Sequence, residues 1–410
     1  MIALLGYGKT NQALLRFLNA NKRSCLVFDD IFCEERVDEQ GNRFLPSSKK
    51  ELNDSELAIP SPGISPSHSL IQNSSNLVSE YDFLLNKNQL QIWISGTNGK
   101  TTTTEMLQAL LCDYGGKSGG NIGLPLAEMQ ERNPQIWILE TSSFSLHYTK
   151  KVFPKVYLLL PLSEDHISWH GSFENYIQDK LSPLARMNED CTAIIPHALS
   201  QRLEVKESKA QIVLYQESVD LVSYFDFDLS KIKFNEPFLL DALLALSGAK
   251  ILLEKDLSEK LLDFQIGKHK LEVLRDEFGR TWVDDSKGTN VDATIWAVRA
   301  YGNSKIYLIL GGDDKGADLS LLFEELRHYR LEIFGIGSNT LKLQELSKVF
   351  DIKFHSCFEL EKAVNLIDQQ HDLQSIALLS PAAASLDQFS SYKERGERFQ
   401  KFVQSLSAKR

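Results

Sequence analysis

Apolar residues recur along the chain at spacings typical of alternating strands and helices. In the opening segment, residues 2–5 are apolar, Gly6-Tyr7-Gly8 predicts a turn, and residues 11–18 have helical spacing. Residues 24–28 return to an apolar strand that ends at Asp29-Asp30. A strand, a glycine turn, a helix and a second strand in this order predict an α/β fold of the nucleotide-binding type.

The same order begins twice more along the chain. Residues 91–95 predict a strand that runs directly into residues 96–101 and then into a helix. After His269, segments of helix length separate short apolar strands at residues 280–283, 305–310, 331–334 and 375–379. This alternation predicts parallel sheets with crossover helices. We therefore predict an α/β protein with three domains, at residues 1–88, 89–267 and 268–410.

Composition narrows the class of protein. With 410 residues, 42% of them hydrophobic and 24% charged, the chain matches a folded protein of several domains. The net charge of -10 disfavours a general nucleic-acid binder, which needs a basic face. The five cysteines lie far apart, which disfavours a disulfide framework or a zinc ribbon. The start lacks the basic region of a signal peptide, and no apolar run reaches the roughly 18 residues of a membrane span. We expect a cytoplasmic protein without membrane insertion.

The strongest local signal is the run Gly96-Thr97-Asn98-Gly99-Lys100-Thr101. Its glycines allow backbone N–H groups to surround phosphate oxygens, Lys100 supplies a positive charge, and the Thr101 hydroxyl can reach Mg²⁺. The helix predicted from Thr102 directs its positive end to the same place. The alternative is an ordinary strand-to-helix turn that happens to contain Gly-Lys-Thr.

The N-terminal glycines give a weaker signal. Gly6-x-Gly8-x-x-Asn11 matches a dinucleotide-binding pattern except for the missing third glycine. It is compatible with an NAD site and with a plain Rossmann-like turn. Asp29 and Asp30 lie where a carboxylate could bind a ribose or simply end a strand in solvent.

Several motifs together resemble the Mur ligase family. They lie at residues 61–64, 96–101, 119–123, 139–144, 163–166, 284–290, 311–315 and 380–389. The phosphate loop and the segments of Glu140 and His166 resemble the wider family. Residues 311–315 and 380–389 resemble the members that add D-glutamate. The resemblance implies three domains: a Rossmann-like one for UDP, a central P-loop ATPase-like one for ATP, and a Rossmann-like C-terminal one for the amino acid.

The resemblance also implies a reaction. Such an enzyme activates UDP-N-acetylmuramoyl-L-alanine with ATP as an acyl phosphate, and the amine of D-glutamate then displaces phosphate, as a step of peptidoglycan precursor synthesis. The cofactors implied are ATP and Mg²⁺, and we expect a monomer. Two anions meet in the first step, so cations must neutralise the developing charge.

The implied catalytic residues are Lys100, Glu140, His166, Lys180 and Lys315. Lys100 binds the β- and γ-phosphates, while Thr101 and Glu140 hold Mg²⁺. His166 and Lys180 hold a second Mg²⁺, with Lys180 carbamylated by CO₂, because an ammonium group cannot bind a metal. Considered alone, Lys180 would be a solvated helix lysine and His166 a hydrogen-bonded histidine. His170 and Trp169 match no motif, and we assign them to the surface or the core.

The resemblance assigns the remaining binding residues by substrate. For ATP they are Gly96, Thr97, Asn98, Gly99, Lys100, Thr101, Thr102, Lys270, Asp285 and Lys287. For the UDP substrate they are Gly8, Lys9, Thr10, Asp29, Ser61, Pro62, Gly63, Asn121 and His166. For D-glutamate they are Thr289, Lys315, Ser385, Leu386 and Tyr392. Asn121, Thr289 and Ser385 could instead be turn or cap residues.

The sequence departs from the family pattern at three places. Lys270 stands where the family usually has arginine. Lysine keeps the positive charge but lacks the bidentate fork of the guanidinium group. Tyr392 stands where phenylalanine is more common. Phe238 and Asp241 replace two asparagines expected near adenine, which predicts weaker ATP binding and some tolerance of other purines.

Three other functions are compatible with parts of the sequence. They are a Mur ligase that adds another amino acid, folylpolyglutamate synthetase, and a nucleotide-binding module without catalysis. A module without catalysis would have little use for Glu140, His166 and Lys180 together.

Overall fold

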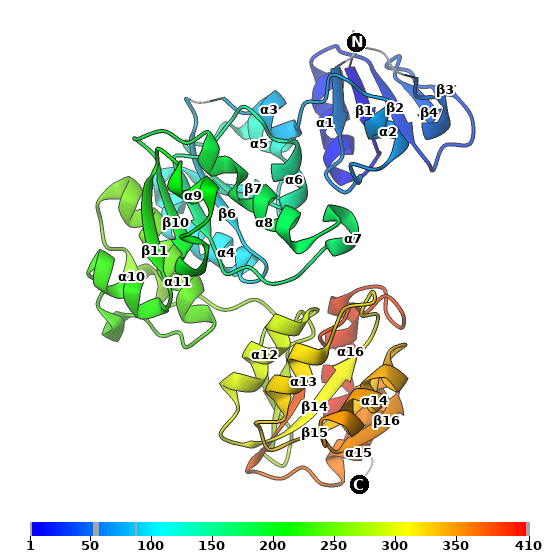
Figure 1. Ribbon diagram of the computed structural model, residues 1–410, viewed down its shortest axis with the longest axis vertical. Helices are drawn as coiled ribbons and strands as arrows, with labels where there is room; N and C mark the ends of the chain where they lie inside the picture. Colours follow the sequence, from blue (N-terminus) through cyan, green and yellow to red (C-terminus); the bar gives the residue numbers. More distant parts are fainter. Residues whose placement is uncertain (1, 52–56, 87, 407–410) are drawn as a thin grey trace. The chain divides into compact units, whose positions relative to one another are not determined.

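A computed structural model describes residues 2–51, 57–86 and 88–406, and it divides into two compact units between Phe264 and Gln265. The first unit holds two sheets and the second holds one (Figure 1). Among the described residues, no helix is long and apolar enough to cross a membrane. The predicted α/β class with three parallel-rich sheets is confirmed.

The N-terminal sheet has the strand order β3-β4-β2-β1-β5 and is parallel except for the β3–β4 pair. Its strands are β1 (Ile2–Leu5), β2 (Cys25–Asp29), β3 (Arg36–Val37), β4 (Arg43–Pro46) and β5 (Leu57–Pro60). Its helices are α1 (Lys9–Ala20) and α2 (Ser69–Gln72), and α3 (Glu80–Leu84) leads to the next sheet. The predicted turn and helix are present, and α1 begins two residues earlier than the helical spacing indicated.

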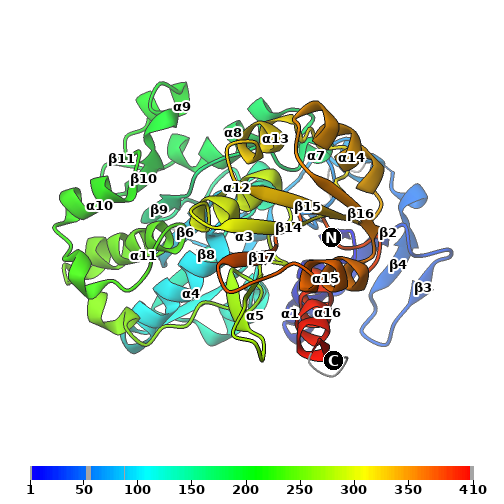
Figure 2. The ribbon, with the colours of Figure 1, turned by 90° about the horizontal axis from the view of Figure 1, so that it is seen from below.

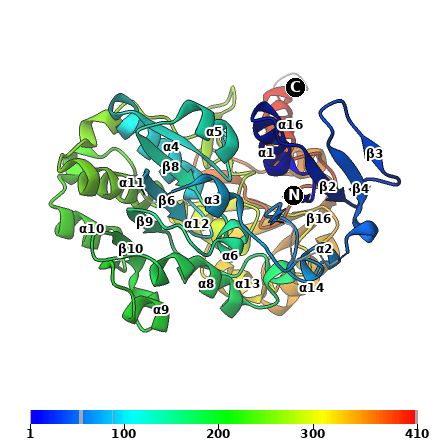
Figure 3. The same cartoon turned by 90° about the horizontal axis from the view of Figure 1, so that it is seen from above.

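The central sheet is entirely parallel, with the order β11-β10-β9-β6-β8-β7. Its strands are β6 (Leu90–Ser95), β7 (Gly116–Gly120), β8 (Ile136–Glu140), β9 (Val156–Leu159), β10 (Thr192–Pro196) and β11 (Gln211–Tyr215). The helices are α4 (Lys100–Leu111), α5 (Leu126–Arg132), α6 (Ser143–Tyr148), α7 (Ile167–His170), α8 (Phe173–Leu181), α9 (Leu203–Lys206), α10 (Ser218–Phe225) and α11 (Phe238–Leu253). Helices α4 and α11 pack together on one side of the sheet, and α6 and α8 lie on the other (Figure 3).

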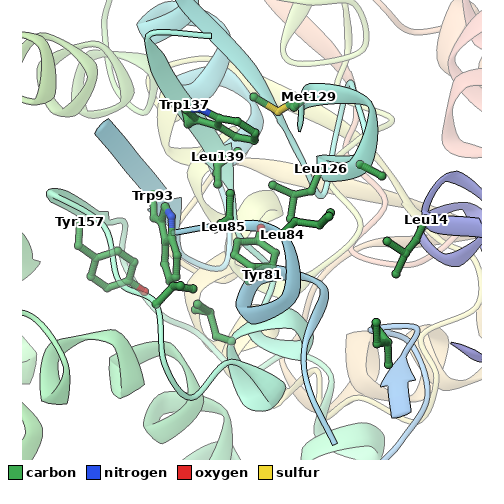
Figure 4. Packing of buried hydrophobic residues seen from close by; sticks show 14 of the residues in the cluster. Leu14, Tyr81, Leu84, Leu85, Trp93, Leu126, Met129, Trp137, Leu139 and Tyr157 are labelled. Atoms are coloured by element: carbon green, nitrogen blue, oxygen red, sulfur yellow. The ribbon is translucent and has the colours of Figure 1, made fainter. Parts of the chain in front are cut away.

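One hydrophobic cluster joins the first two sheets. Trp93, Trp137 and Tyr157 of the central strands belong to the same cluster as Leu126 of α5 and Leu14 of α1 (Figure 4). Burial of large apolar side chains contributes about 1.5–3 kcal/mol each to folding. This shared core explains why the two sheets form one compact unit.

The second unit contains the sheet β12-β13-β17-β14-β15-β16, in which only the β12–β13 pair is antiparallel. The strands are β12 (Glu272–Arg275), β13 (Thr281–Asp284), β14 (Lys305–Gly311), β15 (Leu331–Ile336), β16 (Phe354–Phe358) and β17 (Ser375–Leu379). The helices are α12 (Val291–Ala300), α13 (Ser320–Leu326), α14 (Thr340–Val349), α15 (Leu360–Asp368) and α16 (Tyr392–Ser405). Helices α15 and α16 pack on one face of the sheet and α12 and α13 on the other (Figure 2).

Candidate active site

The predicted phosphate loop connects the end of β6 to the start of α4, and two of its glycines are required by the packing. Gly99 has φ +80°, and a Cβ atom there would lie 2.2 Å from Oδ1 of Asp241. Gly96 has φ +144°, and its Cβ would lie 2.5 Å from Cβ of Leu160. Only glycine fits such positions, so the close packing of Asp241 and Leu160 against the loop requires glycine at both. Helix α4 begins at Lys100, two residues before the predicted start at Thr102.

Two lysines that lie far apart in the sequence meet at this loop. The Lys100 Nζ donates to the carbonyl oxygens of Gly96 and Thr97, both at 2.8 Å. The Lys180 Nζ donates to the same Gly96 oxygen at 2.8 Å and to Oγ of Ser95 at 3.2 Å. Burial lowers the pKa of both amines, and the charge of Lys100 lowers the pKa of Lys180 further. The environment therefore favours a neutral amine at Lys180, which is 1% exposed.

Glu140, at the end of β8, lies between two other predicted site residues. Its Oε2 accepts a hydrogen bond from Oγ1 of Thr101 at 2.9 Å, and its Oε1 accepts one from Nδ2 of Asn121 at 2.7 Å. The carboxylate is 1% exposed. Hydroxyl and carboxylate oxygens are the ligands that Mg²⁺ prefers, so Thr101 and Glu140 fit that ion. In this structure the Asn121 amide contacts Glu140, an interaction that the sequence did not predict.

His166 lies in a loop after β9 and differs from the other predicted metal ligands in exposure. Its side chain is 45% exposed, and its backbone has φ +55°. The ring packs edge-on against Phe144 at 4.7 Å, and Nε2 lies 3.5 Å from Asp165. A histidine with an accessible ring nitrogen is a common metal ligand.

A buried polar network beside these residues was not predicted from the sequence. Asp179 accepts hydrogen bonds from Nδ1 of His147 and from Nδ1 of His170, both at 2.9 Å. Nε2 of His170 lies 2.9 Å from Oγ of Ser143. Burial acts to raise the pKa of Asp179, but the two histidine hydrogen bonds outweigh it and lower that pKa. The only sequence signal was the position of Asp179 directly before Lys180.

Several of the residues predicted to bind the UDP substrate lie together at the start of α1, whereas Asn121 and His166 lie beside the central sheet. Gly8 caps this helix, and a Cβ on Gly8 would lie 3.1 Å from Oγ of Ser61, so the Ser61-Pro62-Gly63 loop faces the glycine turn. Lys9 and Thr10 form the first turn of α1. The carbonyl of Gly63 accepts a hydrogen bond from Nε1 of Trp169 at 3.1 Å, which places this loop beside α7.

Two side chains, one in α1 and one at the end of β2, have roles that the incomplete glycine pattern did not reveal. Asn11, at the position of the missing glycine, donates to the carbonyls of Leu5 and Gly6 at 3.0 and 2.9 Å. Asp29 accepts from the backbone N–H groups of Tyr7 and Ile31 at 2.5 and 3.0 Å. Both side chains therefore hold the glycine turn in place.

In the second unit, three loops carrying predicted residues lie side by side. The backbones of Asp313 and Ala384 hydrogen bond to each other at 3.0 and 2.9 Å. Buried Arg395 donates to the carbonyls of Ser286 and Ala383 at 2.9 and 3.1 Å, and so joins the loop after β13 to the loop after β17. No sequence motif indicated a role for Arg395.

The predicted residues on these loops differ in exposure. Thr289, Lys315 and Leu386 are exposed, and Leu386 is 66% accessible. Lys270, Lys287 and Tyr392 are partly buried, and Ser385 is buried. Asp285 is also buried and accepts a hydrogen bond from Oγ of Ser380 at 2.7 Å. Burial raises the pKa of Asp285 to about 7.

A second group of potential metal ligands, His269, Glu272 and Asp284, lies under these loops with ligand atoms within 4.8 Å of one another. Nδ1 of His269 lies 2.7 Å from Oδ2 of Asp284, and Nε2 of Gln400 donates to both carboxylates. The carboxylate oxygens of Glu272 and Asp284 already accept hydrogen bonds from these side chains, so we assign the group a structural role.

Comparison with known proteins identifies the family. Residues 94–236 match the model of the Mur ligase middle domain. The chain is 47% identical over 407 residues to a UDP-N-acetylmuramoylalanine--D-glutamate ligase of Campylobacter jejuni, covering 99% of this chain and all of that protein. It is 46% identical over 417 residues to the ligase of the same name from Helicobacter pylori, covering 98% and 99% of the two chains.

A solved structure supports the fold. The MurF ligase of Thermotoga maritima, in complex with ADP, superposes with a TM-score of 0.59 at 15% identity over 88% of this chain and 97% of that one. At this identity the likeness concerns the fold alone, and the family follows from the sequence relatives, which span both chains almost completely. The chain belongs to the Mur ligase family.

Proposed function

We propose that this protein uses ATP to join D-glutamate to UDP-N-acetylmuramoyl-L-alanine through an acyl phosphate, in the cytoplasm, as a step of peptidoglycan synthesis. The observation that carries the proposal is the convergence of Lys100, Lys180, Thr101 and Glu140 on one glycine loop. The relatives that cover the whole chain bear the name of the D-glutamate ligase, which favours this activity over the other family members.

The loop is suited to phosphoryl transfer. The backbone of residues 96–99 and the start of α4 would bind the phosphates of ATP, and Lys100 would place its charge on the transferring group. When bound, Mg²⁺ would neutralise the developing negative charge. Thr101 and Glu140 would hold one ion, and His166 with carbamylated Lys180 a second. We also propose that Lys270, Asp285 and Lys287, which lie in the second unit, bind ATP.

The proposed carbamate at Lys180 has a physical basis in its surroundings. Only a neutral amine attacks CO₂, and burial together with the charge of Lys100 lowers the Lys180 pKa. Carbamylation would convert this amine into an anion directly beside the Lys100 cation. The pair would then be oppositely charged, which lowers the cost of burying both groups.

The other two substrates are assigned to separate parts of the chain. We propose that Gly8, Lys9, Thr10, Asp29, the Ser61–Gly63 loop, Asn121 and His166 bind the UDP substrate. We propose that Thr289, Lys315, Ser385, Leu386 and Tyr392 bind D-glutamate, and that Lys315 also acts in catalysis. Thr289 and Lys315 are exposed, as residues that meet a charged amino acid must be before it binds. Domain boundaries near residues 88 and 267 are part of the same proposal.

An amino-acid panel tests this function. The purified protein is mixed with ATP, Mg²⁺ and UDP-N-acetylmuramoyl-L-alanine, and phosphate release is followed with D-glutamate, L-glutamate, L-alanine or a diamino acid. We expect release only with D-glutamate and only when the acceptor is present. Release with a different amino acid would reassign the chain within the family. Release that needs neither substrate, or no release at all, would contradict the ligase activity.

A further inference from the structure

The hydrogen-bonded chain Ser143–His170–Asp179–His147 joins the segments that carry three of the four proposed metal ligands, Glu140, His166 and Lys180. Ser143 is three residues after Glu140, His170 is four residues after His166, and Asp179 directly precedes Lys180. The segments are the start of α6, the short helix α7 and the helix α8. Nothing in the linear spacing requires them to be linked to each other.

The two nitrogens of His170 serve two different segments. Nδ1 lies 2.9 Å from Oδ2 of Asp179, and a carboxylate can only accept, so Nδ1 carries the proton. In the neutral ring, Nε2 then accepts a hydrogen bond from the Ser143 hydroxyl at 2.9 Å. The His170 side chain is fully buried. Its ring lies 5.5 Å from that of Phe144 and 5.3 Å from that of Tyr176, which hold its plane between α6 and α8.

His147 completes the network from the opposite side. Its Nδ1 lies 2.9 Å from Oδ1 of Asp179, so the carboxylate accepts from two histidines at once. Hydrogen-bonded networks of side chains fix the relative position of the segments that carry them. The Asp179 side chain is therefore held in one orientation directly beside the Lys180 backbone.

The order Ser–His–Asp is also that of a nucleophilic triad, and burial argues against that role. Ser143 is 3% exposed, and its hydroxyl is directed at a fully buried ring. A nucleophile must reach a substrate atom, so this serine is not placed to attack one.

We propose that His170 is a positioning residue that holds the segments of Glu140, His166 and Lys180 in register for the reaction. The inference rests on the proposed function, because it concerns the residues assigned there to metal binding. Removal of a group that orients a metal ligand without binding the metal itself lowers metal affinity or activity by about 10–100-fold. His170 would act through Asp179 on Lys180 and through Ser143 on Glu140.

The main test compares His170→Phe with wild type in two measurements. Phenylalanine keeps the ring packing and removes both hydrogen bonds. We expect the Mg²⁺ concentration for half-maximal turnover to rise by about 10-fold or more, while the KM for D-glutamate stays unchanged. In enzyme free of metal and nucleotide and equilibrated with ¹³CO₂, we expect the Lys180 carbamate signal in the carbon-13 spectrum to fall.

Two further variants distinguish the hydrogen bond of His170 to Asp179 from its hydrogen bond to Ser143. An asparagine amide matches the position of Nδ1, and a glutamine amide matches that of Nε2. His170→Asn should therefore keep the link to Asp179 and retain more of the carbamate signal than His170→Gln, which keeps the link to Ser143. If His170→Phe does not fold, Ser143→Ala removes one hydroxyl only and should raise the Mg²⁺ requirement by a smaller factor.

His371→Phe is the matched control. His371 is also a buried histidine with both nitrogens hydrogen bonded, at 2.8 Å to Ser375 and 3.0 Å to Thr281, but it lies in the second unit. It should lose stability without any change in Mg²⁺ requirement or carbamate signal. Equal changes in both variants would show general destabilisation and overturn the proposal, as would an unchanged Mg²⁺ requirement in His170→Phe. A wild-type protein without any carbamate signal would instead contradict the role proposed for Lys180, and the Mg²⁺ measurement would still decide the role of His170.

Discussion

The phosphate loop of the first unit differs from the exposed loops of the second unit in how its candidate residues are held. In the first unit, Lys100 and Lys180 share the Gly96 carbonyl, and Glu140 is hydrogen bonded to Thr101. In the second unit, Thr289, Lys315 and Leu386 are exposed on neighbouring loops. Hydrogen bonds among its own residues thus hold the proposed phosphate site, and groups held in a fixed arrangement stabilise charge in a transition state. The proposed amino-acid site instead offers accessible groups to a small charged molecule.

Burial shifts the pKa values of bases and acids in opposite directions, and both cases occur among the candidate residues. It lowers the pKa of Lys100 and of Lys180, and it raises the pKa of Asp285 to about 7. In each case burial disfavours the charged form. The same physical effect therefore acts on these two bases of the first unit and on this acid of the second unit.

The largest effect is expected at the phosphate loop. Lys100→Ala should lower kcat by roughly 1,000-fold or more, because the cation acts on the transferring phosphoryl group. Turnover is measured at saturating substrates, with circular dichroism to verify the fold. Lys206→Ala, which removes an exposed lysine of the same unit, should retain full activity. An unchanged kcat in Lys100→Ala would exclude this loop as the ATP site.

Lys180→Ala should reduce kcat by about 100-fold to 1,000-fold, the range for loss of one charge-stabilising group. Added formate or acetate should restore part of the activity by replacing the missing carbamate anion. The same anions should not stimulate Lys206→Ala. Rescue by neither anion, together with a free amine in the mass spectrum of the active wild type, would contradict carbamylation.

The pH dependence of stability tests Asp285 in the second unit. Its folded-state pKa, about 7, lies above the ordinary value of 3.8, so its stabilising contribution is complete at low pH and is lost as pH rises through 7. The loss amounts to about 1.4 kcal/mol for each pH unit between the two values. As pH rises, the thermal stability of the wild type should decline, and Asp285→Asn should remove the part of this decline that Asp285 causes. Glu397→Gln, at an exposed carboxylate of α16, should behave like wild type.

Lys315→Ala should raise the KM for D-glutamate by about 10-fold to 100-fold, the range for one hydrogen bond to a charged group. The KM for ATP should stay the same, which would separate this residue from the phosphate site. Lys348→Ala, an exposed lysine of the same unit, is the control. Equal increases in both KM values would show that Lys315 does not act on D-glutamate specifically.

The smallest effect concerns the base of the nucleotide. Asp241 is buried beside Gly99, and its carboxylate accepts a hydrogen bond from Oγ1 of Thr103 at 3.3 Å. Asp241→Asn should change the ATP-to-GTP ratio of kcat/KM by about twofold to tenfold, the range for one amide contact. A constant ratio would mean that Asp241 does not contact the base and that the adenine contacts lie elsewhere.

Local patterns predicted much of the fold. The strands expected at residues 305–310 and 375–379 correspond to β14 and β17, and the glycine run at 96–101 joins β6 to α4 as expected. The predicted α/β fold and the family are confirmed, while the site roles and the boundaries at 88 and 267 remain predictions. The spacing of apolar residues and the residue preferences of turns are local signals that extend over a few residues. The sequence alone is therefore enough to predict these elements.

The sequence by itself determined the order of elements, the phosphate loop and the family motifs. Only the tertiary structure placed Lys180 on the same carbonyl as Lys100, placed Asn121 on Glu140, and linked Ser143, His170 and Asp179 into one network. The physical reason is that these contacts join the ends of different parallel strands and helices. Crossover connections bring such ends together regardless of their spacing in the chain, so no local pattern records which side chains meet.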